Sequence, residues 1–294
     1  FSHETREGIE KMEYYQQDIL ALRRLGHEVS ICNKAKDLSL NFDLVYIWWW
    51  THALYPVLFA KALGKKSIVT GVFNFRHPPY QKARDYFARP LWQKTLIKKA
   101  LLWADLNVFV SKAEHIECAE YFKLPVKAYA PCCVGADYVQ EISATRTLSM
   151  LNICWSGRGN LRRKGVFDIL DAAKILVGRG IAPRITLAGK RGDGFGDLVE
   201  GVRQRGLEKF VHLAGEVSKK AKLSLLADSE IYLQPSYYEG FGLATAEAMA
   251  SGACVITCDV GEVRHVVGDA AIYVSPGNAS ELADAIVRAT TDTD

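Results

Sequence analysis

Short apolar runs alternate with amphipathic stretches along the whole chain, and this alternation predicts strands followed by helices. In the first half, the runs that predict strands are GHEVSIC (26–32), FDLVYIWWW (42–50), KKSIVTGVF (65–73) and ADLNVFVS (104–111). The stretches that predict helices are about 8–25, ALYPVLFAKALG (53–64) and a basic-aromatic stretch, 82–103. Strands that alternate with helices favour parallel βαβ units.

The alternation restarts after a polar connector, QEISATRTLSM. The second half predicts strands in LNICWSG, RITLAG, KFVHLAG, EIYLQPS, ACVITCD and AAIYVS, and helices in GVFDILDAAKILVGRG, SKKAKLSLLADS and NASELADAIVRA. We therefore predict an α/β protein with two domains, residues 1–145 and 146–294, each a Rossmann-like parallel sheet. Ligands bind such sheets beyond the carboxyl ends of the strands, so we expect the two domains to face a cleft.

Composition excludes several classes of protein. The longest run without charge, residues 44–60, contains Thr51, His52 and Pro56 and predicts a strand and a helix better than a membrane span. Seven scattered cysteines, without a CxxC pair or a Cys/His cluster at zinc spacing, predict a reducing cytoplasm and no bound metal. The net charge of +4 comes from residues 1–145, with 19 Lys and Arg against 15 Asp and Glu. This excess is too mild for a nucleic-acid binder.

The stretch YYEGFGLATAEAMASG (237–252) carries the strongest chemical signal. Glu239 ends a strand-to-loop segment, and Gly242 or Leu243 opens a helix whose free N–H groups suit a phosphate. Glu247, one turn into that helix, can accept both hydroxyls of a ribose, and Glu239 can meet the other end of the ligand. Carboxylates at both ends and amides between them fit a nucleotide-sugar. Glutamates at this spacing also occur by chance on solvated helices.

This stretch and the following ACVITCDVG resemble the signature of the family 4 retaining glycosyltransferases, which have the GT-B fold. The resemblance implies that Glu247 binds the donor ribose and that Glu239 contacts the donor sugar. It also implies that the backbone of Phe241, Gly242 and Leu243 lies against the sugar and the diphosphate. The family has a strand before the position of residue 1 and a crossover helix after that of residue 294, so we expect the natural chain to extend at both ends.

A second match is SGRGNLRRKG (156–165), which follows the first strand of the second domain. The resemblance places Gly157 at the donor and the cations Arg158 and Lys164 on its diphosphate. Two cations can stabilise the charge that gathers on a departing nucleoside diphosphate. A solvated basic loop is the alternative, and the roles of Arg162 and Arg163 stay open.

Weaker matches concern the base and the phosphates. HLAGEV resembles the loop whose backbone touches the base, which makes Gly215 and Val217 donor-binding candidates. Gly8 stands where the family has a Gly-Gly pair near the diphosphate. In CDVGEVRHVV the second glycine of another family pair is replaced by Glu262, which puts the turn geometry in doubt, and His265 receives no role.

The first domain, which the resemblance assigns to the acceptor, resembles the family less closely than the second. Gly71 occupies the place of a donor-sugar histidine that is frequent in the family, and the nearest histidine is His77. We name Trp50, His52 and His77 as acceptor-side candidates, although core packing and ordinary loop positions are the alternatives. Residues 82–103 hold six basic residues against one acid with aromatics between them, a pattern that suits a helix on an anionic membrane surface. A solvated face with a buried side is the alternative.

Together these matches predict a cytoplasmic, metal-independent, retaining glycosyltransferase, peripheral at the inner membrane face. Its donor would be a UDP- or GDP-sugar and its acceptor the hydroxyl of a sugar or lipid-linked substrate, in cell-surface polysaccharide or glycolipid synthesis. No further cofactor and no nucleic-acid partner is expected. The alternatives are a non-catalytic nucleotide-sugar-binding relative and a nucleotide-sugar epimerase. There is no GxSxG and no GxxxxGK[ST], so serine hydrolases and P-loop enzymes are disfavoured.

Overall fold

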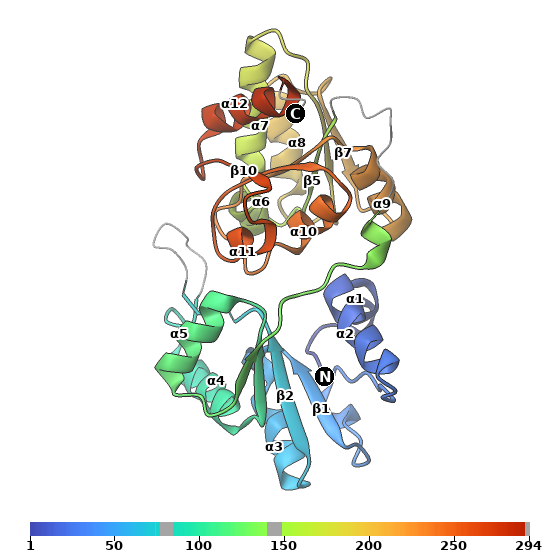
Figure 1. The fold of residues 1–294 in the computed structure, drawn as a ribbon, viewed down its shortest axis with the longest axis vertical. Coiled ribbons are helices and arrows are strands. Elements are labelled where there is room, and N and C mark those ends of the chain that lie inside the picture. Colours follow the sequence, from blue (N-terminus) through green and yellow to red (C-terminus); the bar gives the residue numbers. More distant parts are fainter. Residues whose placement is uncertain (74, 77–84, 140–148, 292–294) are drawn as a thin grey trace. The chain divides into compact units, whose positions relative to one another are not determined.

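The computed structural model describes residues 1–73, 75–76, 85–139 and 149–291. The chain divides into two compact units, Phe1–Cys133 and Val134–Asp294, each built on its own parallel sheet (Figure 1). The predicted α/β class with two parallel sheets is confirmed. The predicted domain boundary near residue 145 lies outside the described residues.

The first unit is a four-stranded sheet in the order β1-β2-β3-β4. Helices α3, α4 and α5 pack on one face, where the apolar side chains of Val45, Ile47, Val69 and Phe109 are buried. Helices α1 and α2 bury Ile9, Tyr15 and Ile19 against Trp48 in a separate cluster. Its elements are α1 (Arg6–Lys11), α2 (Glu13–Arg24), β1 (Leu44–Trp48), α3 (Leu54–Ala62), β2 (Lys66–Gly71), α4 (Leu91–Trp103), β3 (Leu106–Phe109), α5 (Lys112–Phe122) and β4 (Lys127–Tyr129), with 3₁₀ turns at Ala35–Asp37 and Trp50–His52.

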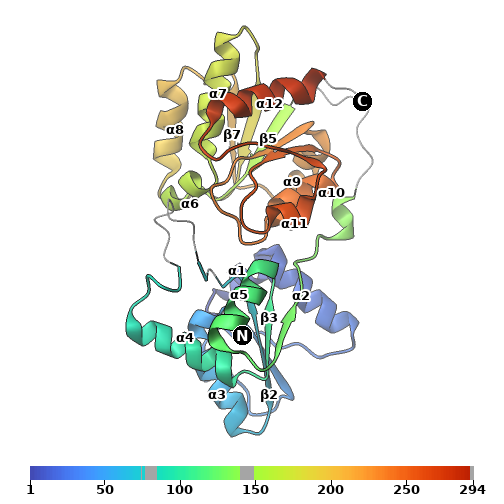
Figure 2. The same cartoon turned by 60° about the vertical axis from the view of Figure 1, so that its left-hand side comes forward.

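The second unit is a six-stranded sheet in the order β10-β9-β8-β5-β6-β7. Figure 2 shows α7, α8 and α12 on one side of it and α9 and α10 on the other. A hydrophobic core lies on each side of the sheet, and neighbouring residues of β5 point alternately into the two cores. Met150 packs with the first set of helices and Leu151 with the second. Its elements are a 3₁₀ turn (Ala136–Tyr138), β5 (Ser149–Ile153), α6 (Arg158–Arg163), α7 (Val166–Gly178), β6 (Arg184–Ala188), α8 (Phe195–Gln204), β7 (Val211–Gly215), α9 (Lys219–Asp228), β8 (Ile231–Gln234), α10 (Leu243–Ala250), β9 (Cys254–Thr257), α11 (Val263–Val267), β10 (Ala271–Tyr273) and α12 (Ala279–Thr291).

Two predictions at the start of the chain were wrong. The single helix predicted over about 8–25 is two helices, because Met12 is extended (φ −82°, ψ 120°) and separates α1 from α2. Gln16 stabilises the break, since its Nε2 donates to the carbonyl of Ile9 at 2.6 Å. The strand predicted over 26–32 does not form. Its apolar residues Val29 and Ile31 pack instead against the Ile9–Tyr15–Ile19 cluster.

The helix predicted over 82–103 is shorter than expected. Helix α4 begins at Leu91, because Pro90 lacks an N–H group and stands in the capping position before it. Residues 85–90 form turns, and 82–84 lie outside the described residues. The uncharged run 44–60 forms β1, a 3₁₀ turn and most of α3, as predicted. Among the helices described, none combines the length and the apolar character needed to cross a bilayer.

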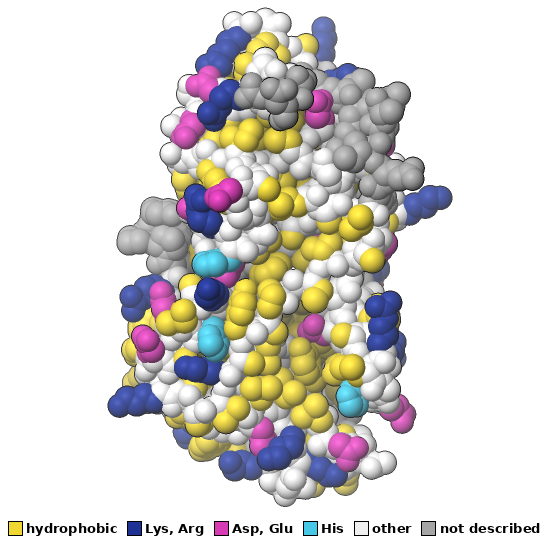
Figure 3. All heavy atoms as spheres, in the orientation of Figure 1, with side chains coloured by type: hydrophobic (Ala, Val, Ile, Leu, Met, Phe, Trp, Pro, Cys, Tyr) yellow, Lys and Arg dark blue, Asp and Glu magenta, His cyan; other side chains and the backbone are white. Residues whose placement is uncertain are grey.

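The charge is dispersed over the surface. On the face drawn in Figure 3, Lys and Arg side chains are scattered, and several lie beside acidic side chains. Ion pairs join many of them along or between helices, for example Arg179 with Asp284 at 2.6 Å and Arg205 with Asp171 at 2.7 Å. Among the described residues on this face, basic and acidic side chains are therefore intermixed.

Candidate functional site

The sheet of the second unit has a switch point between β5 and β8. Strands β6 and β7 follow β5 toward one edge of the sheet. Strand β8 pairs with the other side of β5, and β9 and β10 continue from it toward the opposite edge. In open parallel sheets, ligands bind beyond the carboxyl ends of the strands at such a point. The segments that leave these two ends are 154–157 and 235–239, which contain Gly157 and Glu239.

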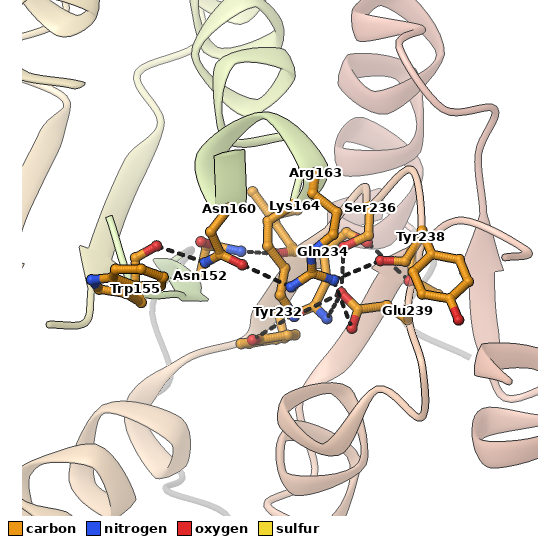
Figure 4. Close-up of polar contacts among 12 residues, drawn as sticks. Asn152, Trp155, Asn160, Arg163, Lys164, Tyr232, Gln234, Ser236, Tyr238 and Glu239 are labelled. Atoms are coloured by element: carbon orange, nitrogen blue, oxygen red, sulfur yellow. Dashed lines mark hydrogen bonds and ion pairs between the residues drawn. The ribbon is translucent and has the colours of Figure 1, made fainter. Parts of the chain in front are cut away.

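A cluster of charged and polar side chains surrounds Glu239 at this point (Figure 4). Its carboxylate is 5% exposed and lies 2.6 Å from Lys164 Nζ and 3.5 Å from an Arg163 guanidinium nitrogen. Gln234 Nε2 and Ser236 Oγ donate to the same oxygen, Oε1, at 2.9 and 2.8 Å. The end of β8, the loop after it and the end of α6 therefore meet at one buried carboxylate.

Glu239 is ionised despite its burial. Desolvation raises the pKa of this carboxyl, but the charges of Lys164 and then Arg163 oppose it, and the net result is a pKa below the usual 4.5. The site is therefore an ion cluster. It provides a fixed negative charge that can accept hydrogen bonds from hydroxyls, with two cations beside it.

Two glycines allow the loops around Glu239 to approach one another. At Gly165 (φ +64°) a Cβ would lie 2.1 Å from the carbonyl oxygen of Pro235. At Gly261 (φ +57°) it would lie 1.7 Å from the carbonyl oxygen of Glu239. Both positions therefore require glycine for conformation and for space. Gly165 ends the turn that carries Lys164, so it brings the lysine to the carboxylate.

Further hydrogen bonds fix the orientation of these groups. Tyr232 donates to Gln234 Oε1 at 2.9 Å, which directs the amide nitrogen of Gln234 toward Glu239. Arg163 donates to the carbonyl of Tyr238 and to Asn160 Oδ1, both at 2.7 Å. Asn160 in turn donates to the carbonyl of Trp155 at 2.6 Å. The network connects the end of β5, α6 and the loop after β8.

Arg158, predicted with Lys164 on the donor diphosphate, pairs with an acidic residue of α8 and not with Glu239. Its Nε is 2.8 Å from Asp197 Oδ2 on α8, and its side chain is 63% exposed. Its backbone N–H donates to Asp193. Gly157 precedes it as the N-cap of α6, with the Trp155 ring 3.0 Å from where a Cβ would be. In this structure Arg163, not Arg158, is the second cation at Glu239.

Glu247 lies in the second turn of α10 and is 3% exposed. Lys222 of α9 reaches its Oε2 at 2.7 Å and lies over the Tyr138 ring, 5.0 Å from the ring centroid. The helix begins as predicted: Gly242 is its N-cap at φ +91°, followed by Leu243, with buried Phe241 before it. An alanine-rich first turn leaves room for a ligand to approach the backbone N–H groups.

The remaining donor candidates fall on strand and turn ends of the second unit. Gly215 ends β7 with φ +69°, and Val217 follows it before α9. The turn at 261–262 needs only one glycine: Gly261 has positive φ, whereas Glu262 is helical (φ −91°, ψ −1°) and buried. The replacement of a second glycine therefore leaves this turn intact. His265 Nδ1 lies 3.6 Å from Glu262.

In the first unit, the candidate residues are placed as follows. Gly8 lies within α1, and its N–H donates to Thr5 Oγ1 at 3.0 Å. Trp50 is buried, donates to Asn107 Oδ1 at 2.9 Å and stacks on Phe109. His52 stacks on His3, with ring centroids 4.2 Å apart. His77 lies outside the described residues.

Two contacts were missed from the sequence. Arg163 stands next to Lys164 in RRKG, and only the three-dimensional turn shows which arginine faces Glu239. Lys222 lies 25 residues before Glu247 in SKKAKLSLLADS, and no spacing rule joins them. A buried carboxylate nevertheless needs a partner, and a lysine on the adjacent helix was the available signal.

Comparisons with known proteins identify a matching family, sequence relatives and solved structures with the same fold. The family described as "Glycosyl transferases group 1" matches residues 153–294. The chain is 27% identical to the O-antigen chain mannosyltransferase B of Escherichia coli over 218 residues, which is 69% of this chain and 56% of the relative. It is 23% identical to the GDP-mannose:cellobiosyl-diphosphopolyprenol alpha-mannosyltransferase of Xanthomonas oryzae, over 88% of this chain and 65% of that one. The chain thus spans roughly half to two thirds of these relatives.

Solved structures share the fold at low identity. A sucrose-phosphate synthase from Thermosynechococcus elongatus has a TM-score of 0.70 at 23% identity, covering 85% of this chain and 65% of that one. The Anabaena protein HepE in complex with UDP has a TM-score of 0.70 at 16% identity, covering 86% and 70%. Residues 153–294 therefore match the family of group 1 glycosyl transferases, and the chain shares the two-sheet α/β fold of GT-B glycosyltransferase structures.

Proposed function

We propose that this protein is a retaining glycosyltransferase that moves a sugar from a nucleotide-diphosphate-sugar to a hydroxyl acceptor. The observation that carries the proposal is the buried, ionised Glu239, held by Lys164 and Arg163 at the switch point of the second sheet. Glu247 follows on the same loop and helix. The family resemblance assigns both glutamates, Arg158 and Lys164 to positions that contact the donor.

Each group has a role in the proposed reaction. Glu247 accepts the ribose hydroxyls, and the first N–H groups of α10 hold the diphosphate. Glu239 orients the hydroxyls of the donor sugar. Lys164 and Arg158 stabilise the diphosphate, whose negative charge grows as the bond to the sugar breaks. With front-face attack, the departing diphosphate takes the proton of the acceptor hydroxyl, so that no covalent enzyme intermediate is needed.

The donor and acceptor classes are also part of the proposal. The names of relatives include a GDP-mannose-dependent mannosyltransferase acting on a diphosphopolyprenol, and one structural neighbour was solved with UDP. We take the donor to be a UDP- or GDP-hexose and the acceptor a sugar or lipid-linked sugar in cell-surface polysaccharide or glycolipid synthesis. Cations of the chain stabilise the leaving group, so neither a resident metal nor another cofactor is included.

Helix α4 has a surface that could attach the protein to a membrane. This helix exposes Leu91 and Trp92, at 77% and 65%, and carries Lys94, Lys98 and Lys99. Exposed apolar side chains among lysines suit the surface of an anionic bilayer. We therefore place the protein in the cytoplasm, at the inner face of the membrane.

The test is turnover with purified protein, UDP- and GDP-hexoses, and a membrane lipid extract as the source of acceptor. Release of nucleoside diphosphate with a product that keeps the donor's anomeric configuration by NMR would support the proposal. A binding protein would hold the donor without consuming it, and an epimerase would convert it without an acceptor. Lys164→Ala and Glu239→Gln should each lower turnover at least about 100-fold; unchanged turnover in both variants would rule out the proposed site.

A further inference from the structure

The first unit has a cavity of its own at the carboxyl ends of β1 and β2. It measures about 130 Å³ and is lined by His3, Trp49, Trp50, Thr51, Phe73 and Arg89, among others. Ligand sites of parallel sheets lie at this end of the strands. The volume is below the roughly 300–1,000 Å³ of pockets that enclose a whole drug-sized ligand, so it suits one chemical group of a larger molecule.

The side chains around the cavity give it a positive electrostatic potential. Arg89 and His3 line it, and His52 stacks on His3 with ring centroids 4.2 Å apart. Among the described lining residues none is acidic. Desolvation, followed by the charges of His3 and Arg89, lowers the pKa of His52, which indicates a positive potential around this ring. An anion in the cavity would relieve that repulsion.

The wall of the cavity is rigid and strained. Trp49 has φ +80° (ψ 115°), a region that residues with a side chain rarely occupy. Its N–H donates to the carbonyl of Thr70 at 2.8 Å, and its indole N–H donates to Tyr15 Oη at 2.6 Å. A Cβ on Gly71 would lie 2.9 Å from the indole ring, so the missing side chain at 71 makes room for Trp49. Strain that neighbouring groups maintain in this way is frequent at ligand sites.

We propose that this cavity binds a phosphate or diphosphate group of the glycosyl acceptor, with Arg89 and His3 as donors, His52 stacked behind His3, and the Trp49 indole as a wall for the adjoining sugar or chain. The proposal rests on the transferase function proposed above and adds the acceptor's chemical class. Arginine forms strong, charge-assisted hydrogen bonds with phosphate oxygens, and a neutral imidazole can add one N–H bond. Two sources share this chemistry: a soluble sugar phosphate and a lipid-linked diphosphate.

The test is NMR of the imidazole groups of His3 and His52 in the full chain, assigned with His3→Gln and His52→Gln. The probes are a hexose 1-phosphate and a short-chain isoprenyl diphosphate, with the hexose and the isoprenol as phosphate-free controls. Excess nucleoside diphosphate fills the second unit during these titrations. We expect saturable shifts with at least one phosphate probe, none with the controls, and about tenfold weaker binding in Arg89→Gln. Arg24→Gln, which changes an exposed arginine on α2, should bind like the wild type.

A response to the hexose phosphate alone identifies a soluble acceptor, and a stronger response to the isoprenyl diphosphate identifies a lipid-linked one. Equal shifts with the phosphate-free controls, or full binding by a folded Arg89→Gln, would overturn the proposal. If nucleotide binds but the imidazole signals do not shift, the acceptor-site proposal is refuted and the donor-site proposal is not. If the signals shift but no nucleotide binds, only the donor site is wrong.

Discussion

Each unit of this protein holds a carboxylate near the carboxyl ends of its strands, Glu239 buried and Asp18 half-buried, and the pKa values of the two shift in opposite directions. Glu239 in the second unit lies between Lys164 and Arg163, which lower its pKa despite burial. Asp18 in the first unit accepts hydrogen bonds from Trp48 Nε1 at 2.9 Å and Tyr46 Oη at 3.1 Å. Burial raises the pKa of Asp18, and these neutral donors only partly offset the rise. Neutral hydrogen-bond donors leave the pKa of the half-buried Asp18 carboxyl raised, whereas nearby cations lower that of Glu239.

Under the function proposed above, Asp18 is a structural carboxylate and Glu239 a functional one. Asp18 holds two aromatic side chains of β1 against α2 and needs no charge for that purpose. Glu239 keeps both its charge and its cations, which are the groups that a sugar and a phosphate can use. The comparison also shows the cost of such a site: burial of two or three charges is tolerated only while every partner remains in place.

The largest effect is expected from Gly165→Ala, which separates Lys164 from Glu239. The new methyl group would meet the carbonyl of Pro235 at 2.1 Å, and the left-handed conformation adds strain. We expect a loss of more than about 3 kcal/mol in the free energy of unfolding, measured by urea titration. The control is Gly206→Ala, which has a similar φ of +67° but no atom within 4 Å and should cost only about 1–2 kcal/mol. Equal losses in both variants would show that the contact with Pro235 does not matter.

Lys164→Ala removes the closest cation and leaves the charge of Glu239 buried. We expect about 3 kcal/mol of lost stability, because one partner of a buried ion pair remains uncompensated. Arg158→Ala is the matched comparison: its exposed pair with Asp197 should contribute less than about 1 kcal/mol to stability. Urea unfolding of both variants measures the contrast, and a larger loss in Arg158→Ala would reverse the assignment of the second cation to Arg163.

Lys222→Ala should have an intermediate effect, on Glu247. The ion pair at 2.7 Å fixes this carboxylate, and both side chains are largely buried. We expect about 2 kcal/mol of lost stability and weaker nucleotide binding, with a partial recovery in Lys222→Arg. Thermal unfolding with and without nucleoside diphosphate measures both quantities. Wild-type stability and affinity in Lys222→Ala would show that Glu247 needs no cation.

Asp18→Asn should change the free energy of unfolding least, and whether it stabilises or destabilises the protein should depend on pH. The raised pKa of Asp18 means that its contribution to stability is present below pH 3.8 and is lost as the pH rises through the folded-state pKa. The asparagine should therefore match or exceed the wild type at pH 7, by less than about 1 kcal/mol. For Glu239 the sign is opposite: its lowered pKa gives stability above pH 4.5 that is lost on acidification.

Urea unfolding of Asp18→Asn and Glu239→Gln between pH 3 and 7 checks both signs. The wild type should lose its advantage over Glu239→Gln as the pH falls, and should lose its advantage over Asp18→Asn as the pH rises. The same pH trend in both variants would contradict the comparison between the two carboxylates.

The sequence predicted the second unit better than the first. Its strand–helix alternation is regular, and the two glutamates and the Gly242 helix start lie close together along the chain. Lys164 lies far from them in sequence and was predicted from a separate motif, SGRGNLRRKG. The break at Met12 and the missing strand at 26–32 depend on tertiary contacts, such as Gln16 with the Ile9 carbonyl, that periodicity does not contain. The partners Arg163 and Lys222 were missed for the same reason, since only the fold brings them to Glu239 and Glu247.

The most direct test of the central claim is calorimetric titration of the purified chain with UDP, GDP and ADP. The account predicts that UDP or GDP binds, that Lys164→Ala and Glu247→Ala weaken this binding at least about tenfold, and that Asp18→Asn leaves it unchanged. Binding that is equally strong in all three variants, or no binding of any nucleotide, would contradict a donor site built on Glu239, Lys164 and Glu247.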